Sequence, residues 1–201
     1  MLKTIHLFRH GQTDWNINRR MQGHSDIPLN EEGRKQALAL QAYFAENPVE
    51  LFISSDLIRA QQTAGIANEK LGLPLEFHAD FREVYLGELE GMTQAEAHEK
   101  FGVESWDKWT SLDPMHFGFT YPKAESALVA VERFSHALKR LCSERSFLNA
   151  GLCTHGLIMR RFLHSLRPEL QEALPIPNCV VYKITWDEQS GKFSFDFNPP
   201  S

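Results

Sequence analysis

Short apolar runs alternate along this chain with longer segments in which apolar residues recur every three or four positions. The short runs are rich in β-branched and aromatic residues, which is typical of buried strands, whereas the longer spacing is typical of amphipathic helices. Strands are therefore predicted at residues 4–8, 51–53, 75–78 and 147–153, and helices at residues 30–46, 57–71, 125–144 and from 157 onward.

Several predicted helices carry signals at their ends. Asn30 is a good N-cap for the first long helix, and Pro48 stops that helix shortly afterwards. Thr93 and Glu96 form a Thr-x-x-Glu capping box that predicts a further short helix. For the helix over residues 125–144, the predicted buried face consists of Leu128, Val131, Phe134 (or Ser135), Leu138 and Leu141.

The alternation of strands and helices predicts an α/β protein, a three-layer α/β/α sandwich with a mostly parallel central sheet. Residues 180–186 and the alternating Phe193, Phe195 and Phe197 predict a closing hairpin. The chain has 201 residues, 42% of them hydrophobic, and no linker rich in Pro, Gly or Ser. A single domain over residues 1–201 is expected.

Charge and composition exclude several classes of partner. The net charge of −5 provides no global attraction to nucleic acid or to an anionic membrane. The three cysteines are too far apart for a disulfide framework or a zinc knuckle. The N-terminal apolar run is too short for a signal peptide, and no segment reaches the roughly 20 apolar residues of a membrane span. We therefore expect a cytoplasmic protein whose partner is a small molecule.

Polar and charged side chains follow three of the predicted strands. Arg9 and His10 follow the first strand, Arg59 lies in the first turn of the helix after the second, and His155 follows a later strand. Ligands of such sheets bind beyond the carboxyl ends of the strands. Because those ends share one edge of the sheet, these side chains are expected to converge there.

Two histidines and two arginines suit phosphoryl transfer through a covalent intermediate. A histidine is a good nucleophile toward phosphorus when cations hold the phosphoryl oxygens, and arginine donates hydrogen bonds in pairs without losing its charge. Gly11 is expected to let backbone N–H groups approach the anion, and the helix starts after Ser55 and Gly156 are expected to add backbone donors. The leaving oxygen needs a proton from a separate acid; Glu83 is the candidate, with Glu88 and Glu90 as alternatives.

No metal or cofactor site is predicted. His6 and His10 have the spacing of a helical metal-binding pair, but on a strand that spacing is roughly 13 Å, too far to share one ion. The chain also has no P-loop, no G-x-S-x-G motif and no dinucleotide fingerprint.

Four motifs together resemble the histidine phosphatase family, also called phosphoglycerate mutase-like, over about the whole chain. The motifs are LFRHGQTDWN at 7–16, SSDLIRAQQTA at 54–64, Glu83 with Gly87-x-x-Glu90-Gly91, and Thr154-His155-Gly156. The resemblance implies the phosphoglycerate mutase-like fold, a phosphorylated His10, and binding of the phosphoryl group by Arg9, Arg59 and His155. It also implies that Glu83 donates the proton and later activates water, and that the substrate-binding residues are Thr13, Asn16, Gln22, Gly23 and Gly156.

Within this family, phosphatases pass the phosphoryl group to water and mutases return it to a sugar acid. Mutases are usually longer, with an additional basic and Pro-rich stretch, whereas residues 93–126 contain three lysines and no arginine. This segment offers little to bind a second anionic group. The sequence therefore favours a metal-independent phosphomonoesterase that acts on a small phosphorylated metabolite. The alternatives are a cofactor-dependent phosphoglycerate mutase and a non-catalytic phosphate-binding or interaction module.

A lid-like insertion is predicted at about residues 93–124. Its aromatic and apolar side chains either cover the site or pack a small subdomain; they are Trp106, Trp109, Met115, Phe117, Phe119 and Tyr121. Two positions depart from the family pattern, because Ala124 and Leu157 stand where glycine is common. The substrate is left open, and either a monomer or a homodimer is expected.

Overall fold

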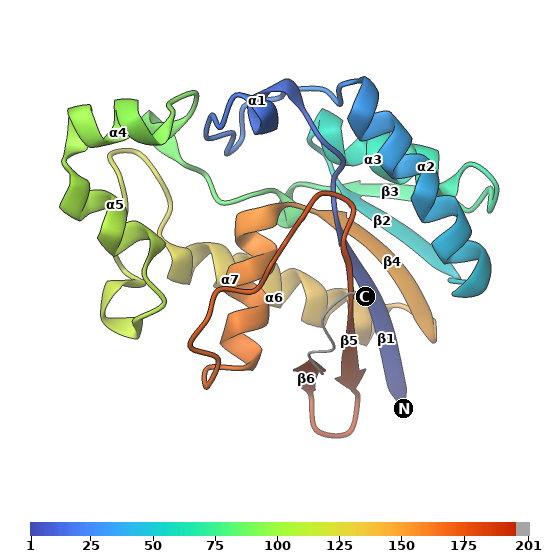
Figure 1. The fold of residues 1–201 in the computed structure, drawn as a ribbon. Coiled ribbons are helices and arrows are strands. Elements are labelled where there is room, and N and C mark those ends of the chain that lie inside the picture. Colours follow the sequence, from blue (N-terminus) through green and yellow to red (C-terminus); the bar gives the residue numbers. More distant parts are fainter. Residues whose placement is uncertain (196–201) are drawn as a thin grey trace.

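The computed structural model describes residues 1–195 and has a six-stranded central sheet (Figure 1). The strands are β1 (Leu2–Arg9), β2 (Leu51–Ser55), β3 (Leu75–His78), β4 (Asn149–Thr154), β5 (Val181–Asp187) and β6 (Lys192–Phe195). Their order is β3-β2-β4-β1-β5-β6. The first four are mutually parallel, and β5 and β6 form the antiparallel hairpin predicted from the sequence. Phe197, which was also assigned to this hairpin, lies outside the described residues.

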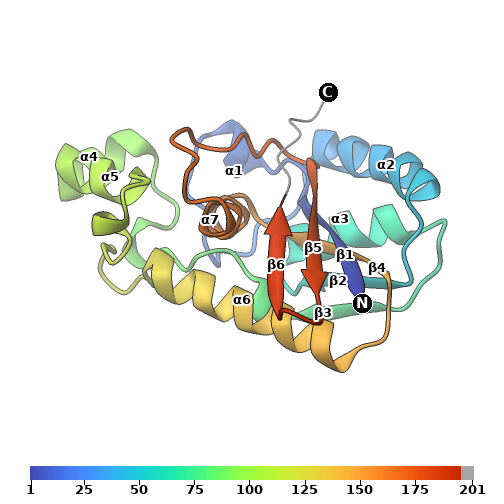
Figure 2. The same cartoon turned by 90° about the horizontal axis from the view of Figure 1, so that it is seen from below.

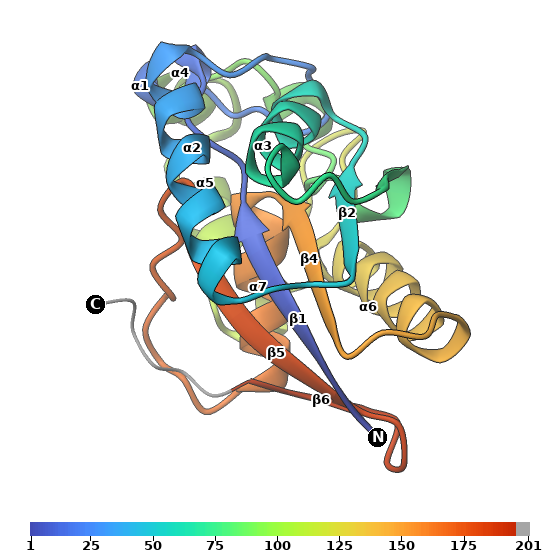
Figure 3. The ribbon, with the colours of Figure 1, turned by 90° about the vertical axis from the view of Figure 1, so that its right-hand side faces the viewer.

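Helices cover both faces of this sheet, which confirms the predicted three-layer sandwich (Figures 2 and 3). The helices are α1 (Asp14–Ile17), α2 (Glu31–Glu46), α3 (Ile58–Asn68), α4 (Gln94–Phe101), α5 (Val103–Thr110), α6 (Ala127–Glu144) and α7 (Gly156–Leu166). Short 3-10 turns occupy Ala79–Phe81 (η1), Gly87–Leu89 (η2) and Pro114–His116 (η3). Helices α2 and α3 lie on one face, and α6 and α7 on the other.

The two faces have separate hydrophobic cores because successive strand side chains point to opposite sides. On β1, Ile5 and Leu7 join the core under α6 and α7, whereas Phe8 packs with Phe44 and Phe52 under α2 and α3. Burial of both faces explains why the central strands read as continuous apolar runs.

Strand register aligns the carboxyl ends that the sequence analysis singled out. Arg9, the last residue of β1, pairs with Thr154 at the end of β4, and Ser54 of β2 pairs with Cys153 of β4. The residues that follow, His10 and His155 among them, therefore emerge at one edge of the sheet.

The predicted buried face of α6 was partly wrong. Leu128 is 57% exposed, and Val131 is only partly buried. The helix begins at Ala127, where the Ser126 side chain accepts a hydrogen bond from the Val129 N–H, and Phe134 packs against Phe81 and Phe162. This packing sets the helix rotation and buries a face made of Ala130, Phe134, Ala137, Leu138, Leu141 and Cys142.

Helix α3 ends earlier than its apolar pattern indicated. It stops at Asn68, whose side chain donates to the Leu73 carbonyl and accepts from the Leu73 N–H. These two bonds replace a further helical turn and lead the chain into β3.

The segment 93–124 contains α4, α5 and η3, which stand apart from the sheet on the side of α7 (Figures 1 and 2). Thr93 and Glu96 form the predicted capping box at the start of α4. None of the helices in the described part of the chain is long and apolar enough to cross a membrane.

Candidate active site

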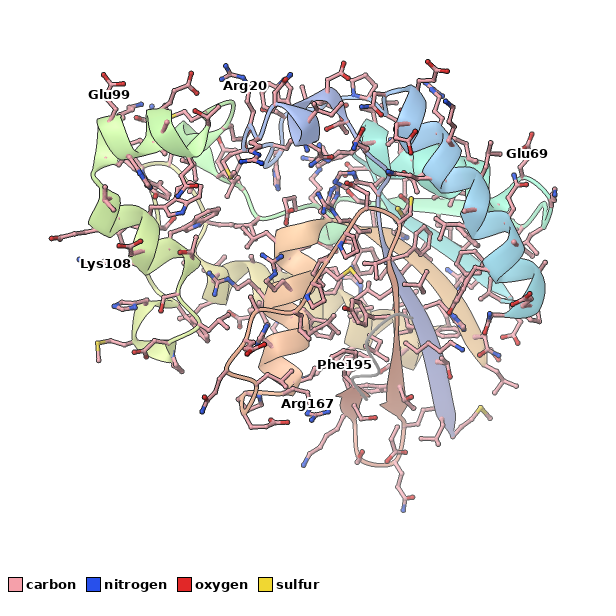
Figure 4. The ribbon with its side chains drawn as sticks, in the orientation of Figure 1. Arg20, Glu69, Glu99, Lys108, Arg167 and Phe195 are labelled. Carbon is pink, nitrogen blue, oxygen red and sulfur yellow. The ribbon has the colours of Figure 1, made fainter. Side chains whose placement is uncertain are left out.

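Arg9, His10, Arg59 and Glu83 line one cavity of about 330 Å³ at the carboxyl edge of the sheet. His155 lies directly beside it, with its ring centroid 5.2 Å from that of His10. In Figure 4, blue nitrogen atoms gather in the space between α1 and the start of α7. The four side chains predicted from three separate strand ends therefore do meet, together with the predicted acid.

One ring nitrogen of His10 is hydrogen-bonded, and the other makes no hydrogen bond within residues 1–195. Its Nδ1 lies 2.7 Å from the carbonyl oxygen of Gly11, so Nδ1 carries the hydrogen and donates it. Burial, then the cations Arg59 and Arg9, lower the pKa of His10 well below its ordinary value. The ring is therefore neutral at physiological pH, and the lone pair of Nε2 remains available for attack on phosphorus.

Gly11 does not present its own N–H to the cavity. Its N–H donates to the Thr63 hydroxyl at 3.0 Å and is not free to bind an anion. A Cβ at this position would lie 2.5 Å from the carbonyl oxygen of Gly33, near the start of α2. Glycine is needed here because the strand end packs directly on that backbone.

Arg59 is fully buried and links the other parts of the site. Its guanidinium donates to the carbonyls of Gly23 and Ser25, both at 2.7 Å, and its Nε donates to Nδ1 of His155 at 3.2 Å. Since His155 accepts at Nδ1, its hydrogen is on Nε2, which donates to the Ser55 hydroxyl at 2.8 Å. Burial and then Arg59 lower the pKa of His155 well below its ordinary value.

Arg9 has a buried donor without a partner. One terminal nitrogen donates to the Ile176 carbonyl at 2.6 Å, while Nε is buried and makes no hydrogen bond within residues 1–195. A Cβ at Gly156 would lie 3.1 Å from this Nε, so glycine leaves room for the guanidinium at the start of α7. An unpaired buried N–H is costly, and an anion in the cavity would satisfy it.

Glu83 binds the N-terminal end of α7, which was expected to face the phosphoryl group. Its Oε1 accepts from the N–H groups of Val84 and Ile158, at 3.0 and 2.7 Å, and its Oε2 accepts from the Leu157 N–H at 2.9 Å. At the start of α3, the Ile58 N–H is likewise taken, by Asp26 at 2.6 Å. The predicted backbone donors of α3 and α7 therefore mostly hold carboxylates of the protein itself.

The alternatives to Glu83 lie outside the cavity. Glu90 accepts from the His24 N–H and the Ser25 hydroxyl, both at 2.7 Å, and so supports the loop that Arg59 also holds. Glu88 is bound to Lys100 and Lys123 near the surface. Only Glu83 of the three lines the cavity.

Four of the five predicted substrate-binding residues line the cavity: Asn16, Gln22, Gly23 and Gly156. The Asn16 Oδ1 accepts from the Thr13 N–H and hydroxyl, and its Nδ2 makes no hydrogen bond within residues 1–195. The Gln22 Oε1 is buried without a partner in the described chain. Thr13 differs, because it is fully buried and its hydroxyl caps α1 instead of reaching the cavity.

The aromatic residues of the insertion divide between the two roles considered for them. Trp106 and Trp109 line the cavity, whereas Tyr121 is buried in the core and Met115 is 82% exposed. At Ala124, the positive φ of 62° falls on the preceding Lys123, so the turn forms without glycine at 124.

Sequence reasoning missed three arginines that line the cavity, Arg20, Arg160 and Arg161. Arg20 lies on the segment after α1 (Figure 4) and pairs with Glu96 at 3.0 Å. Helical spacing provided a signal for Arg160, because it follows Gly156 by four residues and so shares its face of α7. Within residues 1–195, no three His, Cys, Asp or Glu side chains are grouped to hold a metal ion.

Comparison with known proteins identifies related sequences over nearly the whole length. Residues 5–196 match the family model described as "Histidine phosphatase superfamily (branch 1)". The chain is 32% identical to the uncharacterized phosphatase PhoE of Bacillus subtilis over 182 residues, 89% of this chain and 86% of that protein. It is 42% identical to glucosyl-3-phosphoglycerate phosphatase of Mycobacterium tuberculosis over 90 residues, 45% of this chain and 40% of that one.

The fold also matches solved structures. Bacillus stearothermophilus YhfR superimposes with a TM-score of 0.86 at 24% sequence identity, covering 99% of this chain and 98% of that one.

Proposed function

The chain belongs to the histidine phosphatase superfamily, branch 1, and is a phosphatase; on this premise we propose that it hydrolyses a small phosphomonoester through a phosphohistidine at His10. One observation carries the proposal. The neutral His10, whose Nε2 makes no hydrogen bond within residues 1–195, shares a cavity with the carboxyl group of Glu83 and five arginines, Arg9 and Arg59 among them. Neither an arginine-lined binding module nor a structural cavity needs both a nucleophile and an acid.

In the first step, the Nε2 lone pair of His10 attacks phosphorus in line, and the bond from phosphorus to the ester oxygen breaks. Glu83, protonated at this stage, transfers its proton to the departing oxygen. Arg9 and Arg59 offset the charge on the equatorial phosphoryl oxygens, with Asn16 Nδ2 as a further donor. The products of the step are an alcohol and phosphohistidine.

In the second step, Glu83 is ionised and removes a proton from a water molecule, whose oxygen attacks the phosphoryl group. The bond from nitrogen to phosphorus breaks, which returns the electron pair to Nε2 and releases inorganic phosphate. The same carboxyl group thus acts first as acid and then as base, and no metal is required.

Release of phosphate into solution separates the proposed phosphatase from the alternative mutase. We expect the purified protein to liberate inorganic phosphate from a panel of phosphomonoesters, and to exchange 2- and 3-phosphoglycerate at less than a tenth of that rate. Colorimetric phosphate assay and ³¹P NMR measure the two reactions. Exchange faster than hydrolysis would establish the mutase, and no turnover of any ester would favour the non-catalytic module.

We further propose that the insertion at 93–124 is a lid latched by Arg161. This side chain is 8% exposed on α7 and donates to the carbonyls of Trp109 and Ser111, at the C-terminal end of α5. Its guanidinium also lies 5.6 Å from the centroid of the Phe117 ring. A cation at this helix end is favourable, since the exposed carbonyls carry partial negative charge.

Replacing Arg161 with glutamine is expected to release this latch. Amide hydrogen exchange over residues 103–117 should become at least about 10-fold faster, since two charge-assisted hydrogen bonds are lost. Mass-spectrometric hydrogen exchange measures this directly. Arg140→Gln is the control, because Arg140 pairs with Asp80 away from the insertion. Equal exchange in both variants would contradict the latch.

The remaining sequence-based expectations, a cytoplasmic location, no nucleic-acid partner and a monomer or homodimer, stay predictions.

A further inference from the structure

Arg160 is a cavity-lining cation that forms no ion pair within residues 1–195. Its Nε donates to the Leu174 carbonyl at 3.0 Å, which fixes the guanidinium plane. Its two terminal nitrogens form neither a hydrogen bond nor an ion pair with residues 1–195. A guanidinium anchored through Nε presents NH1 and NH2 side by side, which is the arrangement that binds the two oxygens of a carboxylate.

The other arginines of the cavity are already engaged. Arg20 pairs with Glu96, and Arg161 donates to two carbonyls of the insertion. Arg9 and Arg59 flank His10, where the phosphoryl group binds in the proposed mechanism. Among the described residues of the lining, Glu83 is the only carboxylate beside five arginines, and its oxygens accept three backbone N–H groups. With Arg20 paired to Glu96, a phosphate dianion and ionised Glu83 leave one positive charge of the lining unmatched, and Arg160 is the arginine whose terminal nitrogens have no partner within residues 1–195.

The position of Arg160 places it beyond the phosphoryl group. It follows Gly156 by four residues, which corresponds to about 6 Å along the axis of α7. Side chains on a helix lean toward its N-terminus, so the guanidinium extends from there toward the cavity. Apolar side chains also line the cavity, among them Leu157, Ile176 and Trp109.

We infer that Arg160 binds a carboxylate on the leaving group, so that the preferred substrate is a phosphorylated carboxylic acid in which a short spacer separates the two anions. This inference rests on the proposed phosphatase function and names its substrate class. One guanidinium carries one positive charge and two parallel donors, which matches a carboxylate better than a second phosphate dianion. Residues 93–126 offer little to bind a second anion, whereas α7 provides Arg160.

Two phosphate esters that differ in one group test the inference. 3-Phosphoglycerate carries a carboxylate where glycerol 3-phosphate carries a hydroxymethyl group. Each is measured as a competitive inhibitor of p-nitrophenyl phosphate hydrolysis, so neither needs to be turned over. We expect the wild type to bind 3-phosphoglycerate at least about 10-fold more tightly, which corresponds to one charge-assisted pair.

Arg160→Gln is expected to reduce that preference by about 10- to 100-fold, and Arg160→Lys by less, because lysine keeps the charge without the paired donors. Arg34→Gln removes the same charge from an exposed position of α2 and should leave the preference within twofold. Equal weakening of both ligands by Arg160→Gln would overturn the inference and assign Arg160 to the phosphoryl group or to Glu83.

A third ligand, propane-1,3-diol bisphosphate, tests whether Arg160 binds a carboxylate or a second phosphate group. If Arg160→Gln weakens propane-1,3-diol bisphosphate selectively and leaves the preference for 3-phosphoglycerate unchanged, the carboxylate assignment is wrong and the second anion is a phosphate. Failure of the proposed function would look different. In that case p-nitrophenyl phosphate would not be hydrolysed at all, or would be hydrolysed equally well without His10.

Discussion

Replacement of His10 by alanine is expected to abolish turnover of every phosphomonoester, with a loss on the order of 10⁴-fold or more. The reason is that His10 is the only histidine among the described residues that line the cavity, and none of them is a cysteine, serine or lysine. Initial rates of phosphate release from p-nitrophenyl phosphate measure the loss. The exposed His136 on α6 is the matched control, and His136→Ala should retain activity within twofold.

The covalent intermediate can be observed separately from the rate. Wild-type protein quenched during turnover of a ³²P-labelled ester should retain label that is stable in alkali and lost in acid, as expected of a phosphoramidate. The alanine variant should retain none. A folded His10→Ala variant that keeps more than about a hundredth of the wild-type rate would rule out the covalent route.

Replacement of Glu83 by glutamine is expected to lower kcat/KM by about 10²- to 10⁴-fold for an alkyl phosphate. An alkoxide is a poor leaving group and needs the proton that the amide cannot supply. p-Nitrophenolate leaves without a proton, so the loss on p-nitrophenyl phosphate should be at least about 10-fold smaller. Steady-state kinetics on both esters measure the difference.

The glutamine variant should also accumulate phosphohistidine from the aryl ester, because water is no longer activated in the second step. A burst of p-nitrophenolate, one equivalent per protein, would report this. Glu88→Gln is the control, since Glu88 binds Lys100 and Lys123 outside the cavity. Equal losses on the alkyl and aryl esters would indicate that Glu83 binds or positions the substrate and does not transfer the proton.

Short-range sequence signals correctly predicted the parts of the fold that depend on residues close together in the chain. The caps at Asn30 and at Thr93 formed as predicted because both involve side chains within three or four residues of the bonds they make. The face of α6 was mispredicted at Leu128 because its rotation depends on Phe81 and Phe162, which are distant in sequence. Helical periodicity identifies an amphipathic face but cannot choose between two adjacent apolar stripes.

The convergence of His10, Arg59 and His155 was determined by the sequence itself, because parallel strands place their carboxyl ends at one edge whatever the details of packing. Only the tertiary structure decided which polar groups remain free at that edge. It assigned the N–H groups of α7 to Glu83, engaged Glu88 and Glu90 elsewhere, and left the two terminal nitrogens of Arg160 without a hydrogen-bond partner in residues 1–195. The physical reason is that a hydrogen bond depends on atoms within about 3 Å. Here those atoms come from segments more than 50 residues apart, as between Glu83 and α7.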